Sequence, residues 1–171
     1  MDSAELTTLI KNVARGQVSS LEDIYRETKD AVYGYALSIV RNMPDAEDVL
    51  HDCYLKIYNG AAGYSDEGKP MAWIFTITRN LCYRRLEENR KKGASAEADL
   101  FGEMEAGGEL SAEELTVLSD CIFRLSESEQ QVVLLHALSG YKHREIAEML
   151  GKPLSTVLSS YSRALEKMRR M

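Results

Sequence analysis

Apolar residues recur at three- and four-residue steps through much of the first half of the chain, and this period predicts amphipathic helices. One series runs from Leu21 to Val40 and a second from Val49 to Ile57. A third helix is expected to start at Pro70, because the first turn of a helix does not use the N–H that proline lacks, and to run to about Asn89. The Gly-, Ser- and Asp-containing segment 59–69 before it is expected to be a loop. The pattern is that of an all-α protein.

The last third of the chain predicts three short helices in residues 125–170, followed by a basic end. The helices are separated by Gly140 and Tyr141 and by the segment Gly151-Lys152-Pro153, and Ser126 with Glu129 fits a capping box at the first of them. This spacing is typical of a helix-turn-helix, whose second helix enters the major groove of DNA. The pattern therefore predicts a DNA-binding unit at the C-terminal end.

Charge is distributed unevenly along the 171 residues, which carry a net charge of −6. Residues 1–92 have a net charge of −1, residues 93–120 of −8 and residues 121–171 of +3. Segment 93–112 is acidic and glycine-rich with few large apolar residues, so we expect a flexible acidic linker there. The chain is thus predicted to form two small helical domains, 1–92 and 113–171, and the bulk acidity does not argue against nucleic-acid binding by either.

Several classes of protein are disfavoured by what the sequence lacks. No run approaches the roughly 18 apolar residues of a membrane span, and the N-terminus has no leader pattern. No nucleophile–base constellation or phosphate-cradling glycine loop indicates an enzyme, and no cofactor is expected. A metal site is not expected either, since His51 and Cys53 diverge on a helix and His136 and His143 lack cysteine companions. The odd number of cysteines predicts reduced, mostly buried thiols in a cytoplasmic protein: Cys53, Cys82 and Cys121.

The second predicted helix carries a cluster of acids near its start. Asp45 is a candidate N-cap, and acids in a first turn are favoured by the helix dipole, so capping alone could explain them. What remains is a face of Asp45, Asp48, Asp52 and Lys56 that could dock a basic or polar partner.

The third predicted helix combines aromatic and basic residues. Ile74, Ile77 and Leu81 form its apolar stripe. Another side carries Trp73, Thr76, Asn80 and Tyr83, flanked by Arg79, Arg84 and Arg85. Aromatic rings stack on unpaired bases and arginines neutralise phosphates, so this side suits single-stranded nucleic acid. The alternative is that the tryptophan and tyrosine pack in the core while the charges are solvated.

Three segments in a fixed order resemble the extracytoplasmic-function (ECF) sigma factors of bacterial RNA polymerase. They are DAEDVLHDCYL at 45–55, AWIFTITRN at 72–80 and IAEMLG at 146–151. Each is weak alone, but their order, with a helix-turn-helix last, is specific, and the resemblance covers nearly the whole chain.

The resemblance implies a role for each segment, in a cytoplasmic protein that uses no cofactor. Core RNA polymerase would be bound by Asp45, Glu47, Asp48, His51, Asp52 and Tyr54. The −10 promoter element would be melted and read by Trp73, Thr76, Arg79, Asn80, Tyr83, Arg84 and Arg85, with loop 63–69 capturing an unstacked base. The −35 element would be read by Lys142, Thr156, Ser159, Ser160, Arg163 and Lys167. An anti-sigma factor clamped between the domains is the further partner that the resemblance implies.

The chain departs from the family pattern at some of these positions. Leu158, Ser159 and Ser160 stand where many members have Lys-Ser-Arg, which predicts a weak −35 contact or one that depends on DNA shape. His51 stands where glutamine is common. Two other interpretations remain open: a helix-turn-helix regulator that does not engage polymerase, and a helical interaction adaptor.

Overall fold

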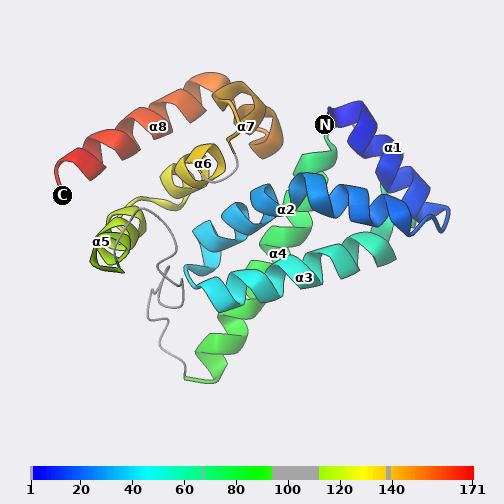
Figure 1. Cartoon of the computed structure of the whole chain (residues 1–171), viewed down its shortest axis with the longest axis horizontal. Helices are drawn as coiled ribbons and strands as arrows, with labels where there is room; N and C mark the ends of the chain where they lie inside the picture. Colours follow the sequence, from blue (N-terminus) through cyan, green and yellow to red (C-terminus); the bar gives the residue numbers. More distant parts are fainter. Residues whose placement is uncertain (1, 67, 94–111, 138–139) are drawn as a thin grey trace.

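The computed structural model describes residues 2–66, 68–93, 112–137 and 140–171, and every regular element in these ranges is helical (Figure 1). The N-terminal part contains α1 (Ser3–Ala14), α2 (Ser19–Val40), α3 (Met43–Gly60), the short 3-10 helix η1 (Ala61–Gly63) and α4 (Pro70–Lys91). The C-terminal part contains α5 (Ala112–Phe123), α6 (Glu127–Ala137), α7 (His143–Leu150) and α8 (Leu154–Arg169). The all-α prediction is confirmed. Most of the predicted linker lies outside the described residues.

Helix starts follow local capping chemistry. α4 begins at Pro70, as the sequence predicts, and ends at Lys91. α3 begins earlier than expected, at Met43, because the side chain of Asn42 accepts a hydrogen bond from the Asp45 N–H at 2.9 Å. Asn42 is therefore the N-cap, and the prediction of Asp45 in that position is wrong. At its other end α3 continues to Gly60, into the segment predicted as a loop.

The first helix, α1, was not predicted from the sequence. Asp2 and Glu5 form a capping box, in which the backbone N–H of each donates to the carboxylate of the other, at 3.0 and 2.8 Å. Leu6, Ile10 and Val13 are buried at four- and three-residue steps. The acidic start and the apolar stripe were both readable in the sequence.

α2 lies at the centre of the molecule, with α3 and α4 packed on one side and α6 on the other (Figure 1). A continuous apolar core includes residues from both parts of the chain. α2 and α6 approach closely at Gly34, where an added Cβ would lie 3.8 Å from the backbone oxygen of Leu134. The two predicted helical units therefore pack against each other in this conformation.

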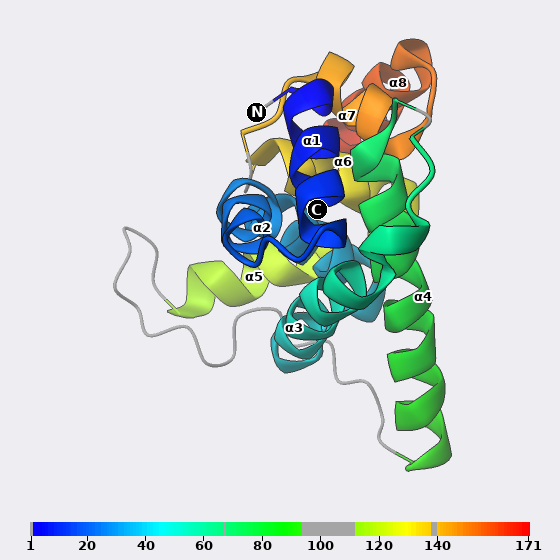
Figure 2. The ribbon, with the colours of Figure 1, turned by 90° about the vertical axis from the view of Figure 1, so that its right-hand side faces the viewer.

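α8 runs along the outside of the molecule, packed on α6 and α7, while α4 extends beyond the body at its C-terminal end (Figure 2). None of the helices in the described ranges has both the length and the apolar character needed to cross a bilayer.

The cysteines are all free, and two of them are fully buried. Burial raises the pKa of the Cys53 thiol to about 11 and that of Cys82 to about 12. Neither is a thiolate at neutral pH, and the prediction that the cysteines are mostly buried is confirmed.

Candidate functional site

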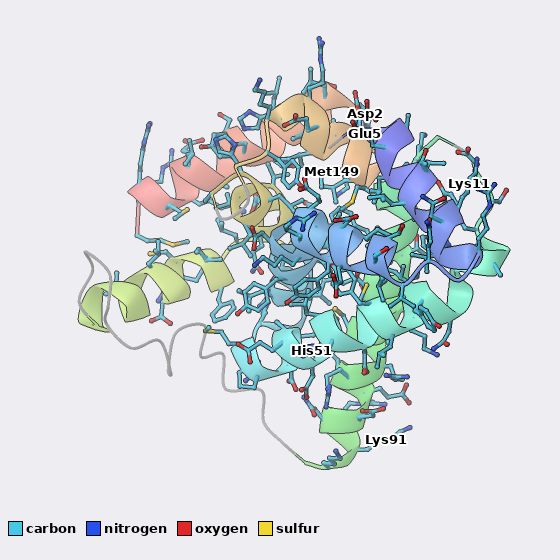
Figure 3. All side chains as sticks on the ribbon, turned by 45° about the vertical axis from the view of Figure 1, so that its right-hand side comes forward. Asp2, Glu5, Lys11, His51, Lys91 and Met149 are labelled. Atoms are coloured by element: carbon cyan, nitrogen blue, oxygen red, sulfur yellow. The ribbon has the colours of Figure 1, made fainter. Side chains whose placement is uncertain are left out.

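Four exposed side chains form a line along the outer face of α3, which we call the α3 stripe: Glu47, His51, Leu55 and Tyr58. They follow one another at three- and four-residue steps, and His51 can be located on α3 in Figure 3. Glu47 and His51 were predicted as contact residues, whereas Leu55 and Tyr58 were not. Leu55 is 63% exposed and Tyr58 46%, and large apolar side chains gathered on a surface mark contact sites. Continuing the His51 spacing along the helix would have found both.

A second line of α3 side chains, Asp45, Asp48 and Asp52, lies on the side of α3 that meets α4, where Asp45 is mostly covered and Asp48 and Asp52 remain partly exposed. Nη2 of Arg85 lies 2.6 Å from the Asp48 carboxylate, and its Nε lies 3.7 Å from Asp45. The Asp52 carboxylate accepts from Arg84 at 2.9 Å. The acidic face predicted to be open for docking is therefore paired with the arginines predicted to meet DNA. We call this set the α3–α4 ion pairs.

Tyr54, predicted to contact polymerase, lies on the buried side of α3. Its hydroxyl is 2.7 Å from that of Thr28, and its ring packs edge-on against Tyr25 with centroids 4.9 Å apart. Burial raises the pKa of the Tyr54 phenol, and the Thr28 contact only partly offsets this. In this conformation Tyr54 cannot reach a partner, which corrects the expectation, and its role is to hold α3 on α2.

α4 brings most of the predicted −10 residues to its surface. Thr76, Arg79, Asn80 and Tyr83 are exposed, and Trp73 is half-buried. The Arg79 guanidinium lies over the Tyr83 ring, 5.3 Å from its centroid, in a cation–π interaction. The Thr76 hydroxyl donates to the Ala72 carbonyl at 2.8 Å, which occupies its proton.

A hollow of about 410 Å³ lies between α3 and α4, with Trp73, Ile77 and Leu81 as its apolar wall. Its polar lining comes from Lys56, Asn80 and Arg84, while Gly60 completes it. The Trp73 ring also packs against Tyr64, with centroids 4.9 Å apart. An apolar wall beside an amide and two cations matches the chemistry of an unpaired base and its phosphate.

Loop 63–69, expected to capture a base, is described except for residue 67. Asp66 accepts hydrogen bonds from the Lys11 ammonium at 2.8 Å and the Gly68 N–H at 3.1 Å. These bonds hold the pKa of Asp66 below its ordinary value, the Lys11 bond contributing most. The Lys11–Asp66 bond therefore connects the loop to α1. Gly68 adopts a left-handed conformation with φ 71°.

The helix-turn-helix is formed by α7, a turn at Gly151 and α8. Gly151 ends α7 with φ 62°, a conformation that glycine adopts without the steric cost of a side chain. The buried side of α8 is made by Val157, Ser160 and Ala164. The predicted contact residues Lys142, Thr156, Ser159, Arg163 and Lys167 are all exposed.

Two of the predicted −35 residues are serines whose surroundings differ from expectation. Ser160 is only 2% exposed and therefore faces the core of the helix-turn-helix, which removes it from the contact set in this conformation. The Ser159 hydroxyl donates to the Ser155 carbonyl at 2.7 Å, so its proton is used within the helix.

Two cations of α8, Arg163 and Lys167, lie beside Glu129 of α6. Lys167 Nζ lies 3.0 and 2.8 Å from the two carboxylate oxygens, and Arg163 Nε lies 3.9 Å away. Burial alone would raise the pKa of Glu129, but bonds from Lys167 and Ser126 outweigh it and the pKa is lowered. The N–H of Ser126 donates to Glu129 at 2.9 Å, which forms one half of the predicted capping box.

Two histidines and a tyrosine pack together where α6, α7 and α8 meet, a cluster that the sequence did not reveal. The rings of His136 and His143 stack with centroids 4.7 Å apart, and Tyr161 meets both edge-on at 5.2 and 4.5 Å. Burial, and then the neighbouring His136, lower the pKa of His143. Among the described residues, no group of three or more His, Cys, Asp or Glu side chains could hold a metal ion.

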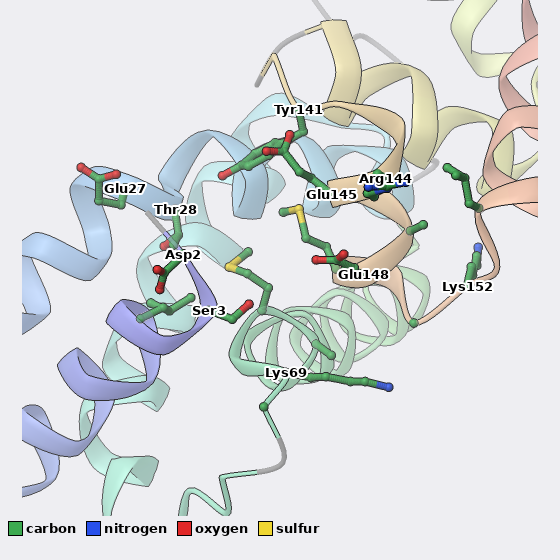
Figure 4. Close-up of a pocket in the computed structure, with 18 residues that line it drawn as sticks. Asp2, Ser3, Glu27, Thr28, Lys69, Tyr141, Arg144, Glu145, Glu148 and Lys152 are labelled. Atoms are coloured by element: carbon green, nitrogen blue, oxygen red, sulfur yellow. The ribbon is translucent and has the colours of Figure 1, made fainter.

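A cleft of about 1060 Å³ opens between the N-terminal and C-terminal parts (Figure 4). α1, part of α2 and the start of α4 form one wall, and α7 with the start of α8 forms the other. Met71 and Met149 give it apolar surface, and charged side chains from both walls surround that surface: Asp2, Glu27, Lys69, Arg144, Glu145, Glu148 and Lys152. Apolar surface with a charged rim suits an amphipathic partner.

Comparison with known families gives two matches, in the same order as the two helical parts. The model of Sigma-70 region 2 matches residues 24–92, and that of Sigma-70 region 4 matches residues 115–168. Among curated relatives, the ECF RNA polymerase sigma factor SigK of Mycobacterium ulcerans (strain Agy99) is 24% identical, with 98% of this chain and 93% of the relative covered. SigK of Mycobacterium tuberculosis (strain ATCC 25618 / H37Rv) gives the same identity and coverage.

Solved structures share the fold over most of the chain. CnrH, in its complex with the cytosolic domain of CnrY, superposes with a TM-score of 0.67 at 20% identity, covering 97% of this chain and 96% of CnrH. The sigma factor RpoE of Bartonella quintana, in complex with the anti-sigma factor NepR, gives a TM-score of 0.62 at 21% identity, covering 87% and 94%. At this level of identity the likeness concerns the arrangement of helices.

Proposed function

Because the chain belongs to the extracytoplasmic-function sigma factors of bacterial RNA polymerase, we propose that it binds core polymerase and directs it to a class of promoters. Promoter recognition, DNA melting and initiation follow from this binding. The factor needs no catalysis of its own, because preferential binding of the unpaired strand offsets the cost of unstacking bases. It would act in the cytoplasm, where polymerase and DNA are found.

The α3 stripe carries this proposal. It offers an acid, an imidazole and two exposed apolar side chains on one rigid helix, which suits a protein partner better than a nucleic acid. We propose that core polymerase docks on Glu47, His51, Leu55 and Tyr58, with Asp48 and Asp52 beside them. A helix-turn-helix regulator that does not engage polymerase would need no such surface.

The two DNA-binding surfaces are proposed on α4 and on the helix-turn-helix. On α4, the hollow beside Trp73 and Asn80 would receive an unpaired base of the −10 element while Arg79 and Tyr83 follow the strand. On α8, Thr156 and Arg163 would face the −35 element, with Lys142 at the start of α7 meeting phosphate. An interaction adaptor would have no use for these exposed groups.

An anti-sigma factor is proposed as the occupant of the cleft between the two parts. RpoE of Bartonella quintana, which shares the fold, was solved with the anti-sigma factor NepR, and CnrH with the cytosolic domain of CnrY. An amphipathic segment that binds both walls at once would hold the parts together and keep the factor from polymerase.

Reconstitution tests the proposal directly. The purified protein is mixed with bacterial core polymerase, and binding is measured by size-exclusion chromatography. The same mixture is then used to transcribe a genomic library, and the transcription start sites are mapped. We expect co-elution and starts at a shared promoter class that core alone does not give. Replacing Leu55 and Tyr58 by alanine should abolish co-elution, with Val18→Ala as the control, because Val18 is exposed but lies outside α3. A chain that neither co-elutes nor directs a start would refute the proposal.

A further inference from the structure

The first two turns of α8 present leucines where a helix that reads DNA ordinarily presents polar side chains. Leu154, which also lines the edge of the cleft between the two parts, is 38% exposed, and Leu158 is 47% exposed. The two residues are four apart, so they lie on one flank of the helix. The buried side of α8, which includes Val157 and adjoins the leucines, packs on α6 and α7.

Several of the polar groups on this part of α8 are already engaged, whereas Ser155 and Thr156 stay exposed. The Ser159 hydroxyl donates to the Ser155 carbonyl at 2.7 Å, and Ser160 is 2% exposed. Farther along α8, Lys167 is held by the buried carboxylate of Glu129 at 2.8 Å. The start of α8 therefore offers a groove the two exposed leucines beside the hydroxyls of Ser155 and Thr156.

In a helix-turn-helix, the N-terminal residues of the second helix contact the base edges in the major groove. The apolar group that base edges display there is the C5-methyl of thymine. We propose that Leu154 and Leu158 are specificity-determining residues that contact thymine methyl groups in the upstream promoter element. This inference rests on the proposed function and adds to it the base that α8 selects.

Geometry and charge fit that assignment. Four residues of helix span about 6 Å, which is close to two base-pair steps of about 3.4 Å each, so the leucines would meet two thymines roughly two positions apart. Lys142 and Arg144, exposed at the start of α7, can neutralise phosphates without reading sequence. Burying one methyl group changes an affinity by about fourfold, so each leucine is worth a modest and measurable preference.

The test removes only the methyl group. Upstream sequences preferred by the reconstituted holoenzyme are first selected from duplexes with a randomised segment, and we expect thymine enriched at two nearby positions. Each thymine is then replaced by deoxyuridine, which keeps base pairing but lacks the methyl. We expect about fourfold weaker binding at each position. Leu154→Ala and Leu158→Ala should each lose sensitivity at one position, whereas Val18→Ala, which truncates an exposed side chain remote from α8, should keep both.

Two outcomes would overturn the inference. If deoxyuridine duplexes bind as tightly as thymine duplexes, α8 reads shape or phosphate and not the methyl groups. If Leu158→Ala weakens binding to core polymerase and leaves the thymine preference intact, the leucines form a protein contact. Failure of the proposed function is distinguishable from both, because it would appear earlier, as absence of co-elution and of any start site.

Discussion

At the scale of single residues, Glu129 joins α6 to α8. Its side chain is 4% exposed yet carries a charge, which is stable only because Lys167 and the Ser126 N–H bind its oxygens. A buried charge without these partners would destabilise the helix-turn-helix strongly.

Replacing Glu129 by glutamine should destabilise the chain by about 1 to 3 kcal/mol at pH 7, because charge-assisted hydrogen bonds to Lys167 are lost. The folded-state pKa of Glu129 lies below its ordinary value of 4.5, so its stabilising effect is complete well above 4.5 and is lost as the pH falls through the lowered pKa. Urea unfolding at pH 7 and between pH 5 and 3 measures both effects. Glu166→Gln, in an exposed pair with Arg170, is the control and should change little. Equal effects of the two substitutions would contradict the role of Glu129.

His143 should make stability depend on pH in the range where histidine titrates. Its folded-state pKa is lowered from the ordinary 6.5, so the unfolded chain binds the proton first and stability decreases as the pH drops below 6.5. We expect a lower melting temperature at pH 5.5 than at pH 7.5, and His143→Phe should weaken that dependence. The exposed His51, changed to phenylalanine, should leave it intact. A pH dependence that survives in His143→Phe would count against this cluster.

At the scale of elements, the α3–α4 ion pairs lock two helices together. Arg85→Ala should cost about 1 kcal/mol, because this half-buried guanidinium meets both Asp45 and Asp48. Arg84→Ala should cost at most about 0.5 kcal/mol, since Arg84 and Asp52 are both largely exposed. Chemical denaturation of the two variants measures the difference. A double-mutant cycle of Arg85 with Asp48 should give a coupling energy, and a value of zero would show that the pair does not join the helices.

The helices themselves were largely predictable, and their ends less so. The three- and four-residue period located α2, α3 and α4, because a buried stripe leaves a clear signature. The start of α3 was missed because Asn42 and Asp45 are both good caps, and only the geometry of the Asn42 side chain decides between them. The pairing of Asp48 with Arg85 joins residues 37 apart in sequence, and no local pattern reveals such a contact.

At the scale of the whole molecule, α6 determines how the two parts meet. Its residues 132–135 are all buried, since one side packs on α2 and the other on α8. A helix that is buried all round lies between two layers, and the Val-Val-Leu-Leu run at these positions was the available signal for this. The sequence suggested two separate units because its composition reveals the acidic segment between them. Composition carries no signal for the packing of α2 on α6.

Gly34 should control that contact. Gly34→Ala places a Cβ at ordinary contact distance from Leu134 and should be tolerated. Gly34→Leu would force a larger side chain against the backbone of α6, at a cost of about 1 to 3 kcal/mol, and should separate α6 from α2. Small-angle scattering should show a larger radius of gyration for Gly34→Leu than for Gly34→Ala. Equal radii with normal stability would show that the α2–α6 packing has room to spare.

Trp73 is an intrinsic fluorescent reporter on the surface of α4. It is the single tryptophan of the chain, and it sits in the hollow between α3 and α4 beside Tyr64. Its indole emission therefore comes from one known place, and a base stacking there would quench it. Strand separation at a promoter could then be followed in real time in the unlabelled factor, by its own fluorescence, provided that the tryptophans of polymerase are replaced or spectrally silent.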